Sequence, residues 1–261
     1  MVRPMTQIRT LFMLLLLCPL SALARPSLEV QLKKSSGELG RPVNLKIIAE
    51  ELKTDLSNLS LLSLNEQFVL DTKDLETEII EQNDGNAKQS SNGQARRQTL
   101  SLKLYPRQTG EILIPSFTID KYSSTEKTIK IQDAATYGEK ISLDWKFTSP
   151  EVWQREQILV SLTLTTPEKY ASIKLAKQTI DGIEITPLAV NREWVEGDQA
   201  GRSRITAGWS LLPLKPGNIE IDLPAIEYHL NGVVRRVFYL PKTKLTIRPL
   251  APYLPATIPV G

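Results

Sequence analysis

Few side chains in this sequence of 261 residues could support catalysis. His229 is the only histidine and Cys18 is the only cysteine, so a zinc site built from Cys and His ligands cannot be assembled. The sequence contains none of the motifs H-E-x-x-H, G-x-S-x-G or G-x-x-x-x-G-K-[ST]. His229 lies beside Asn231-Gly232, a tight hairpin turn, which favours a strand-end histidine over a catalytic base. We therefore predict a protein that is not an enzyme and needs no cofactor or metal.

The carboxylates leave one enzymatic alternative open. A hydrolase that uses a pair of carboxylates has no short sequence motif, so the lack of a motif does not exclude this class of enzyme. Pairs such as Asp71/Asp74 and Glu76/Glu78 are typical of solvated strand or loop positions. A carboxylate hydrolase is therefore the least favoured of three functional classes.

Four tryptophans suggest a second alternative, a periplasmic module that binds carbohydrate or peptidoglycan. Trp145 continues an alternating apolar face and Trp209 lies in a strand, so we expect both in the core. Trp153 and Trp194 have polar neighbours and are the better candidates for the surface. If these two rings gather on one exposed face, carbohydrate binding gains support.

The N-terminus has the features of a secretory signal peptide. Arg3 and Arg9 precede the apolar run from Leu11 to Leu17, and Ala22-Leu23-Ala24 is a small-x-small cleavage site. Residues 1–24 should be removed after Ala24, which places the mature protein in the periplasm. Lipidation of Cys18 is disfavoured because a lipobox has a small residue where Leu17 stands.

The charge balance argues against nucleic acid. Loss of Arg3 and Arg9 leaves 30 of the 32 basic residues against 29 acidic ones, a net charge of +1. No apolar stretch after the signal peptide has the ~20 residues that a transmembrane helix needs. We expect the mature chain to have no transmembrane helix.

Alternation of apolar and polar residues dominates the mature chain. Apolar residues occupy every second position in 141–147, in 158–164 and in 100–104, which predicts strands with one face on a core. Residues 52–64 could contain a helical turn, but helical periodicity is otherwise hard to find. The polar run 82–98 predicts a long loop, since it lacks large apolar residues. Many short strands separated by Gly and Pro predict an all-β fold of β-sandwiches.

The order of strands and turns occurs twice. Residues 102–119 and 212–228 each contain a strand, a turn with glycine, a second strand and a proline, so Gly110 should match Gly217 and Pro115 should match Pro224. We predict one β-sandwich module over residues 25–133, a second over 134–248, and a Pro-rich tail over 249–261.

A family resemblance is carried mainly by one string. Residues 99–119 read T-L-S-L-K-L-Y-P-R-Q-T-G-E-I-L-I-P-S-F-T-I, and Ser124-Thr125 and I-K-I follow. Weaker similarity lies in residues 59–70 and in the Pro-rich stretch 253–261. In these segments the sequence resembles the BatD aerotolerance proteins, which are linked to oxygen tolerance in bacteria.

The resemblance implies tandem immunoglobulin-like modules that face the periplasm and have no known catalytic residues. It also implies partners: proteins with von Willebrand factor A (VWA) domains and, indirectly, a MoxR-type AAA+ ATPase. BatD proteins usually continue into a C-terminal membrane helix, whereas this sequence ends at Gly261. We expect a short member of the family or the product of a truncated reading frame.

One loop has side chains that suit the implied partner. Many VWA domains hold a divalent metal with one open coordination position, and Mg²⁺ prefers hard oxygen ligands. Glu196 and Asp198 could supply the carboxylate, and Trp194 could add an apolar anchor beside it. The alternatives are a solvated acidic turn and an edge strand that pairs with the partner.

Overall fold

The computed structural model describes residues 26–81, 94–136, 138–180, 182–196 and 201–250. The predicted signal peptide, residues 1–24, and most of the predicted Pro-rich tail lie outside the described residues. Among the described residues, the only helical segments are two short 3-10 helices, η1 (Leu56–Asn58) and η2 (Leu62–Leu64). None of the helices in this part of the chain has the length and apolar character needed to cross a bilayer.

The first β-sandwich is built from nine strands. One sheet has the order β1-β3-β5-β4, the facing sheet has the order β2-β9-β6, and β7 pairs with β8. The strands are β1 (Ser27–Leu32), β2 (Ser36–Glu38), β3 (Val43–Glu50), β4 (Phe68–Glu81), β5 (Gln94–Pro106), β6 (Gly110–Ile114), β7 (Thr118–Ile119), β8 (Tyr122–Ser123) and β9 (Lys127–Gln132).

The second β-sandwich contains the remaining strands. Its largest sheet has the order β12-β14-β19-β17-β16 with β18 paired to β19, and it is completed by the sheets β13-β23-β20 and β15-β21-β22 and the pair β10-β11. The strands are β10 (Ala135–Thr136), β11 (Glu139–Lys140), β12 (Ser142–Phe147), β13 (Glu151–Trp153), β14 (Ile158–Thr166), β15 (Ala171–Leu175), β16 (Gln178–Ile180), β17 (Ile183–Pro187), β18 (Asn191–Val195), β19 (Arg202–Pro213), β20 (Gly217–Ile221), β21 (Ile226–Leu230), β22 (Val233–Phe238) and β23 (Thr243–Arg248).

Each sandwich has its own core. Buried apolar side chains from Leu28 to Ile131 form one cluster, and those from Ala134 to Ile247 form another. Leu39 packs against both clusters. The structure thus confirms the predicted fold class, an all-β chain of tandem immunoglobulin-like sandwiches, and the predicted alternation positions β14 with its apolar residues inward.

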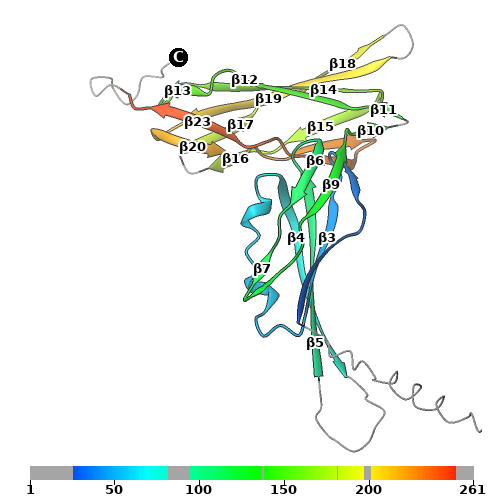
Figure 1. Ribbon diagram of the computed structural model, residues 1–261. Helices are drawn as coiled ribbons and strands as arrows, with labels where there is room; N and C mark the ends of the chain where they lie inside the picture. The colour runs from blue at the N-terminus through cyan, green and yellow to red at the C-terminus, as the bar shows by residue number, and fades with distance from the viewer. Residues whose placement is uncertain (1–25, 82–93, 137, 181, 197–200, 251–261) are drawn as a thin grey trace, which may run out of the picture.

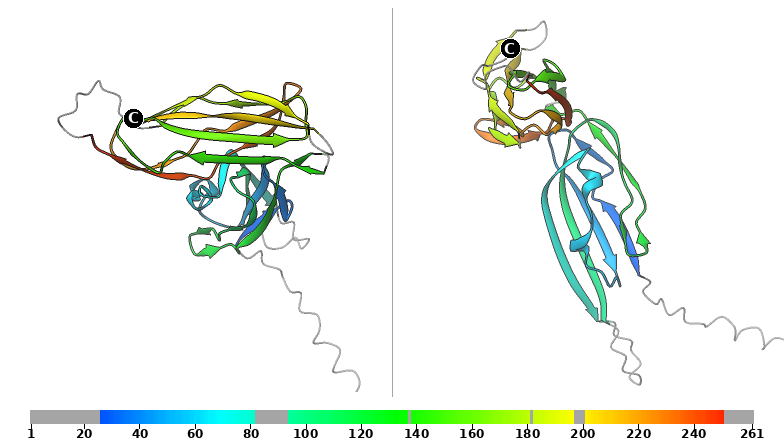
Figure 2. Two further views of the ribbon diagram at one scale, coloured as in Figure 1. Left: turned by 90° about the horizontal axis from the view of Figure 1, so that it is seen from above. Right: turned by 90° about the vertical axis from the view of Figure 1, so that its left-hand side faces the viewer.

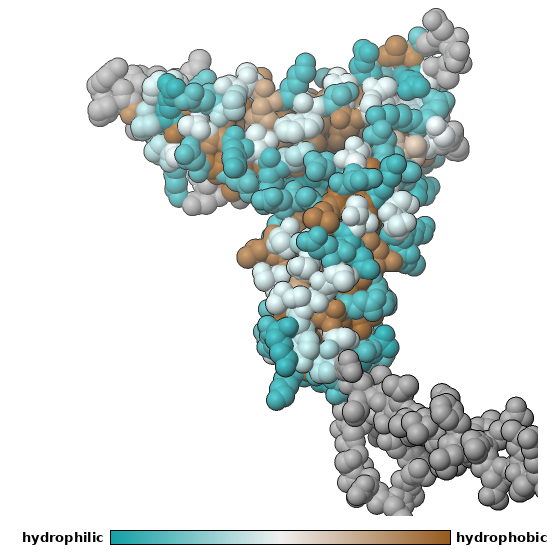
Figure 3. Space-filling model, viewed as in Figure 1, coloured by the Kyte–Doolittle hydropathy of each residue, from teal (hydrophilic) through white to brown (hydrophobic). Residues whose placement is uncertain are grey.

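The two sandwiches form a T. The second sandwich lies across one end of the first, and the β4–β5 hairpin points away from this junction (Figure 1, Figure 2). Polar and apolar patches alternate over the visible surface of both sandwiches (Figure 3). The junction between the two bodies, which we call the joint, decides how the surfaces of the two sandwiches are oriented relative to each other.

The predicted repeat is visible in the strand pairing. Gly110 begins β6 opposite Ile131 of β9, and Gly217 begins β20 opposite Ile247 of β23. Both glycines have positive φ, 111° and 137°, a region that favours glycine. The two turns are therefore equivalent, as the sequence predicted.

Two local predictions were wrong. Trp145 and Leu143 are half-buried and only flank the second core, because β12 is the outermost strand of its sheet. Part of the run 82–98 is also not a loop, since β5 begins at Gln94. Residues 94–98 pair with β4, and backbone pairing needs no apolar side chain.

Candidate functional site: the joint and the β18 arm

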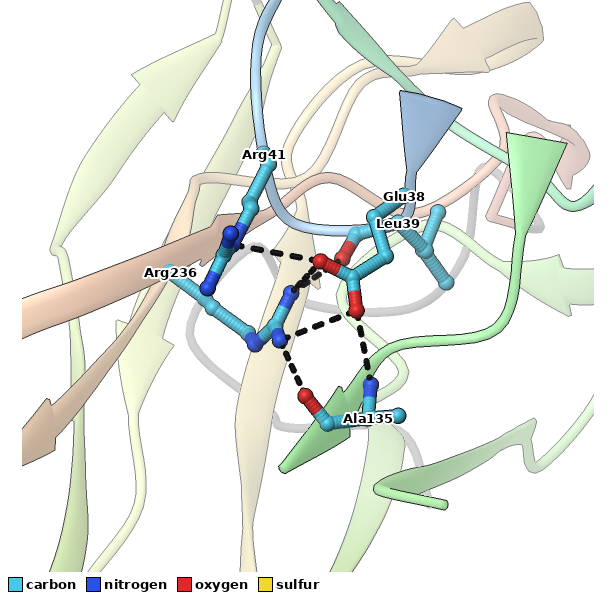
Figure 4. Close-up of polar contacts among 5 residues, drawn as sticks. All are labelled: Glu38, Leu39, Arg41, Ala135 and Arg236. Carbon is cyan, nitrogen blue, oxygen red and sulfur yellow. Dashed lines mark hydrogen bonds and ion pairs between the residues drawn. The ribbon is translucent and has the colours of Figure 1, made fainter. Parts of the chain in front are cut away.

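The joint is held on one side by a buried arginine of the second sandwich. Arg236 in β22 has 4% of its side chain exposed and forms an ion pair with the carboxylate of Glu38 at the end of β2 (Figure 4). Its Nη1 lies 3.1 Å from Oε2 of Glu38, and its Nη2 donates to Oε1 at 3.2 Å. The same guanidinium donates to the backbone carbonyls of Leu39 and Ala135. A planar fork with several donors suits this arrangement better than a lysine would.

The environment of Glu38 keeps it charged. Burial alone raises its pKa, but the hydrogen bond and the positive charge of Arg236 act in the opposite direction. The backbone N–H of Ala135 and the exposed guanidinium of Arg41 lower the pKa further. The net result is a pKa below the ordinary value for glutamate, which favours the charged form that pairs with Arg236.

A second buried arginine crosses the joint in the other direction. Arg107 follows β5 of the first sandwich and donates to both carboxylate oxygens of Asp222, at 2.8 and 2.7 Å. It also donates to the carbonyl of Leu240 at 2.9 Å. Because each sandwich contributes one arginine and one carboxylate, the joint resists both sliding and opening.

Close backbone packing completes the joint. The N–H of Val237 donates to the carbonyl of Gly40 at 3.0 Å. Gly40 has a φ of 79°, and a Cβ atom at this position would lie 2.7 Å from the ring of Phe238. The rings of Tyr105 and Tyr239 meet nearby, with centroids 5.6 Å apart. These contacts leave the two sandwiches little freedom to rotate against each other.

Sequence reasoning missed the joint residues. Glu38, Arg107 and Arg236 are ordinary charged residues whose partners lie more than 90 positions away along the chain. The one available clue is that Arg107 lies inside the string that resembles the BatD family.

The predicted partner-binding residues belong to a projecting hairpin, which we call the arm. All five residues of β18 are exposed, and the strand leaves the body of the second sandwich together with the start of β19 (Figure 1). Trp194 is 38% exposed, with its ring against Gly201 and with Nζ of Lys169 5.7 Å from the ring centroid. Glu196 is exposed directly after β18, while Asp198 lies outside the described residues. The structure thus places Trp194 and Glu196 on one arm.

The exposed tryptophans do not form a common surface. Trp153 is 43% exposed on β13, and β13 and β18 belong to different sheets at opposite ends of the second sandwich (Figure 1). The guanidinium of Arg248 lies 5.6 Å from the ring centroid of Trp153. A cation therefore stands over each ring, where a sugar would stack. This arrangement gives no support to the carbohydrate-binding alternative.

His229 is a buried strand residue. It is 5% exposed, and its Nε2 lies 3.0 Å from Oε2 of Glu227 on the same strand. Ser172 lies opposite His229 in the strand register, but no hydrogen bond between them is found in the described part of the chain. Within the same residues, no group of three or more His, Cys, Asp or Glu side chains is arranged to hold a metal ion.

One family model matches the first sandwich. Residues 30–131 match the family model described as "BatD DUF11 like domain", which confirms the resemblance found in the sequence. A comparison with curated protein sequences gives no match.

Several solved structures align with this chain at low identity and low TM-score. FdeC, an Escherichia coli adhesin, is 13% identical over 85% of this chain and 62% of its own, with a TM-score of 0.20. InvE, an adhesin of Yersinia pseudotuberculosis, is 12% identical over 85% of this chain and 58% of its own, with a TM-score of 0.22. The E. coli alpha-2-macroglobulin is 14% identical over 86% of this chain and 17% of its own, with a TM-score of 0.31. The chain spans less than two thirds of the length of each of these three proteins.

Proposed function

We propose that this chain, whose residues 30–131 match the BatD family model, is a non-catalytic protein-interaction module of the bacterial envelope. It works in a complex with VWA-domain proteins that are linked to a MoxR-type ATPase, as the family resemblance implies. The observation that carries the proposal is the arm of β18, an exposed hairpin that makes no core of its own and projects from a rigid body. Such an element suits contact with another protein.

The joint gives the arm a fixed direction. Arg107 and Arg236 hold the second sandwich across the end of the first, so a partner bound to either sandwich finds the arm in one place. Ordering before binding reduces the entropy that a complex must lose.

Contact with the partner is made through a metal. Glu196 or Asp198 supplies a carboxylate to the open coordination position of the divalent ion held by the VWA domain. Trp194 lies at the base of the same loop and packs beside this contact. The rival mode is strand addition, because among the described strands β18 pairs only with β19 and leaves its other edge open.

Export is part of the proposal. The chain is secreted to the periplasm, and its signal peptide is cleaved after Ala24. N-terminal sequencing of the mature protein should give Arg25 as the first residue. A Met1 terminus, or lipid on Cys18, would show that this assignment is wrong.

We also propose the domain limits 25–133 and 134–248, with a Pro-rich tail over 249–261. The proposal is supported by the change from one core to the other between Ile131 and Ala134. Limited proteolysis should cut between the folded modules at Gln132 or Asp133, which are exposed, and weakening the joint should make this cut faster.

The test of the metal-bridged mode is a binding assay against the co-encoded VWA proteins, with and without EDTA. The double change Glu196→Ala and Asp198→Ala should abolish binding, as should EDTA. The matched control is Asp74→Ala with Glu76→Ala, two exposed acids with the same spacing on β4. Binding that survives both EDTA and the double change eliminates the metal bridge, and absence of binding to every VWA protein eliminates the partner.

A further inference from the structure

The two sandwiches end in equivalent structures. In the first, β2 runs parallel to β9, the N–H of Leu39 donates to the carbonyl of Gln132, and the N–H of Arg41 donates to the carbonyl of Glu38. In the second, β13 runs parallel to β23, and the same two bonds join Gln154 to Arg248 and Glu156 to Trp153. The pattern of backbone bonds therefore matches position by position.

The residue between these bonds has the same unusual backbone in both repeats. Gly40 has a φ of 79°, and its counterpart Arg155 has a φ of 69°. Arg107 lies three residues before Gly110 of β6, and Leu214 lies three residues before Gly217 of β20. The N–H of Arg107 donates to the carbonyl of Gln67, the residue before β4. The N–H of Leu214 donates to the carbonyl of Gly182, the residue before β17. Leu214 is thus the counterpart of Arg107.

These positions define two surfaces of common origin. We call Glu38, Leu39, Gly40, Arg107 and Gln132 the first end, and Trp153, Gln154, Arg155, Leu214 and Arg248 the second end. The first end is covered by a β-sandwich, since β22 of the second sandwich lies over Gly40 and Glu38. At the second end Trp153 is 43% exposed and Leu214 is 46% exposed, so nothing in the described residues covers them.

We propose that the second end is a docking surface for a β-sandwich domain of a partner protein. The surface shares its pattern of backbone hydrogen bonds with the end that receives a β-sandwich in the same chain, and it differs at the position of Gly40, where Arg155 carries a side chain. It lies at the opposite end of the second sandwich from the arm, so it can be occupied while the arm binds elsewhere (Figure 1). The inference concerns a surface separate from the one in our proposed function and does not depend on it.

Differences between the two ends define the chemistry of this partner. The first end offers the carboxylate of Glu38 to an arginine, whereas the second end has Trp153 in that place, and the neighbouring Arg248 is already paired with Glu151. Two apolar side chains of the second end are exposed, Trp153 and Leu214. The docking edge of the partner therefore presents apolar side chains toward these two residues.

The experiment is site-specific crosslinking in cells that produce the full chain. A photoreactive phenylalanine derivative is placed at Leu214, and the matched control is the same residue at Tyr170, which is 65% exposed on the same sandwich. We expect an adduct from Leu214 only, joined to a peptide from a β-sandwich domain of another protein.

Second changes then test the chemistry of the surface. Trp153→Ala should reduce the adduct by about tenfold or more, because it removes the exposed apolar side chain that the partner contacts. The arm changes Glu196→Ala and Asp198→Ala should leave it unaltered. The proposal is overturned by no adduct, by equal adducts from Tyr170, or by an adduct to this chain, to a second copy or to a VWA domain.

Discussion

Replacing Arg236 with alanine should strongly destabilise the joint. Arg236 is almost fully buried and makes contacts with Glu38, Leu39 and Ala135. The alanine variant leaves the Glu38 carboxylate and two backbone carbonyls without their shared donor. Unpaired buried groups of this kind account for most of the loss when one member of a buried ion pair is removed.

The magnitude follows from how much of the cluster is buried. Removal of one partner from a buried ion pair typically costs about 3–5 kcal/mol. Glu38 retains 25% of its side-chain exposure and keeps the N–H of Ala135. We therefore expect the low end of that range, about 3 kcal/mol in the free energy of unfolding.

Two related changes set the scale. Glu38→Gln keeps hydrogen bonding but removes the charge, which should cost about 1–2 kcal/mol. Arg41→Ala removes a guanidinium that is 62% exposed, which should cost about 0.5 kcal/mol or less. The expected order of destabilisation is Arg236→Ala, then Glu38→Gln, then Arg41→Ala.

The assay uses the uneven placement of tryptophan. All four tryptophans lie in the second sandwich, so tryptophan fluorescence in urea follows that sandwich, while far-UV circular dichroism follows both. In Arg236→Ala the two signals should separate into two transitions, since the coupling across the joint is lost. If Arg236→Ala and Arg41→Ala differ by less than about 0.5 kcal/mol, the joint is not what we have described.

Three further changes test other parts of the structure. Gly40→Ala and Gly232→Ala carry the same backbone penalty, with φ of 79° and 78°, but only the alanine at position 40 would meet the ring of Phe238. Gly40→Ala should therefore lower the free energy of unfolding in urea by about 1–3 kcal/mol more than Gly232→Ala does. Equal losses would contradict the close packing at Gly40. Trp209→Ala should lower the free energy of unfolding by about 3–5 kcal/mol because the side chain is fully buried. Trp145 is half-buried, so Trp145→Ala should lower it by about 1–2 kcal/mol. The reverse order would refute our assignment of the core. Hydrogen bonds from the backbone N–H of Ser57, and then from Gln98 and Arg96, lower the pKa of Asp55 to about 2. The folded pKa lies below the unfolded value, so this stability is present above about pH 4 and is lost as the pH falls toward 2; Asp55→Asn should flatten that part of a stability–pH curve, and an unchanged slope would argue against the effect.

Much of the fold could be predicted because burial has a period in sequence. Ile158, Val160, Leu162 and Leu164 alternate, and all four are buried in β14. The repeat was visible as well, because a turn with positive φ favours glycine wherever it recurs. Alternation does not reveal which strand lies at the edge of a sheet, and for that reason Trp145 was wrongly predicted to be fully buried.

The joint could not be predicted in the same way. Its ion pairs link residues that are close only after both sandwiches have folded, such as Arg107 and Asp222. Glu, Asp and Arg are also the residues expected on any solvated strand, so their type gives no hint of burial. The arm was the opposite case: Trp194 among polar neighbours predicted an exposed aromatic, and it is exposed.

The parallel strand pairs have a mechanical consequence. In each sandwich a strand near the beginning runs parallel to the last strand, β2 beside β9 and β13 beside β23. Tension applied to the chain at the two ends of a sandwich draws these strands in opposite directions along their own length. Their evenly spaced hydrogen bonds are then loaded in shear and must break together, whereas a hairpin pulled at its open end breaks one bond at a time. Each of these parallel pairs therefore resists, as a unit, a pulling force that reaches its two strands along the chain.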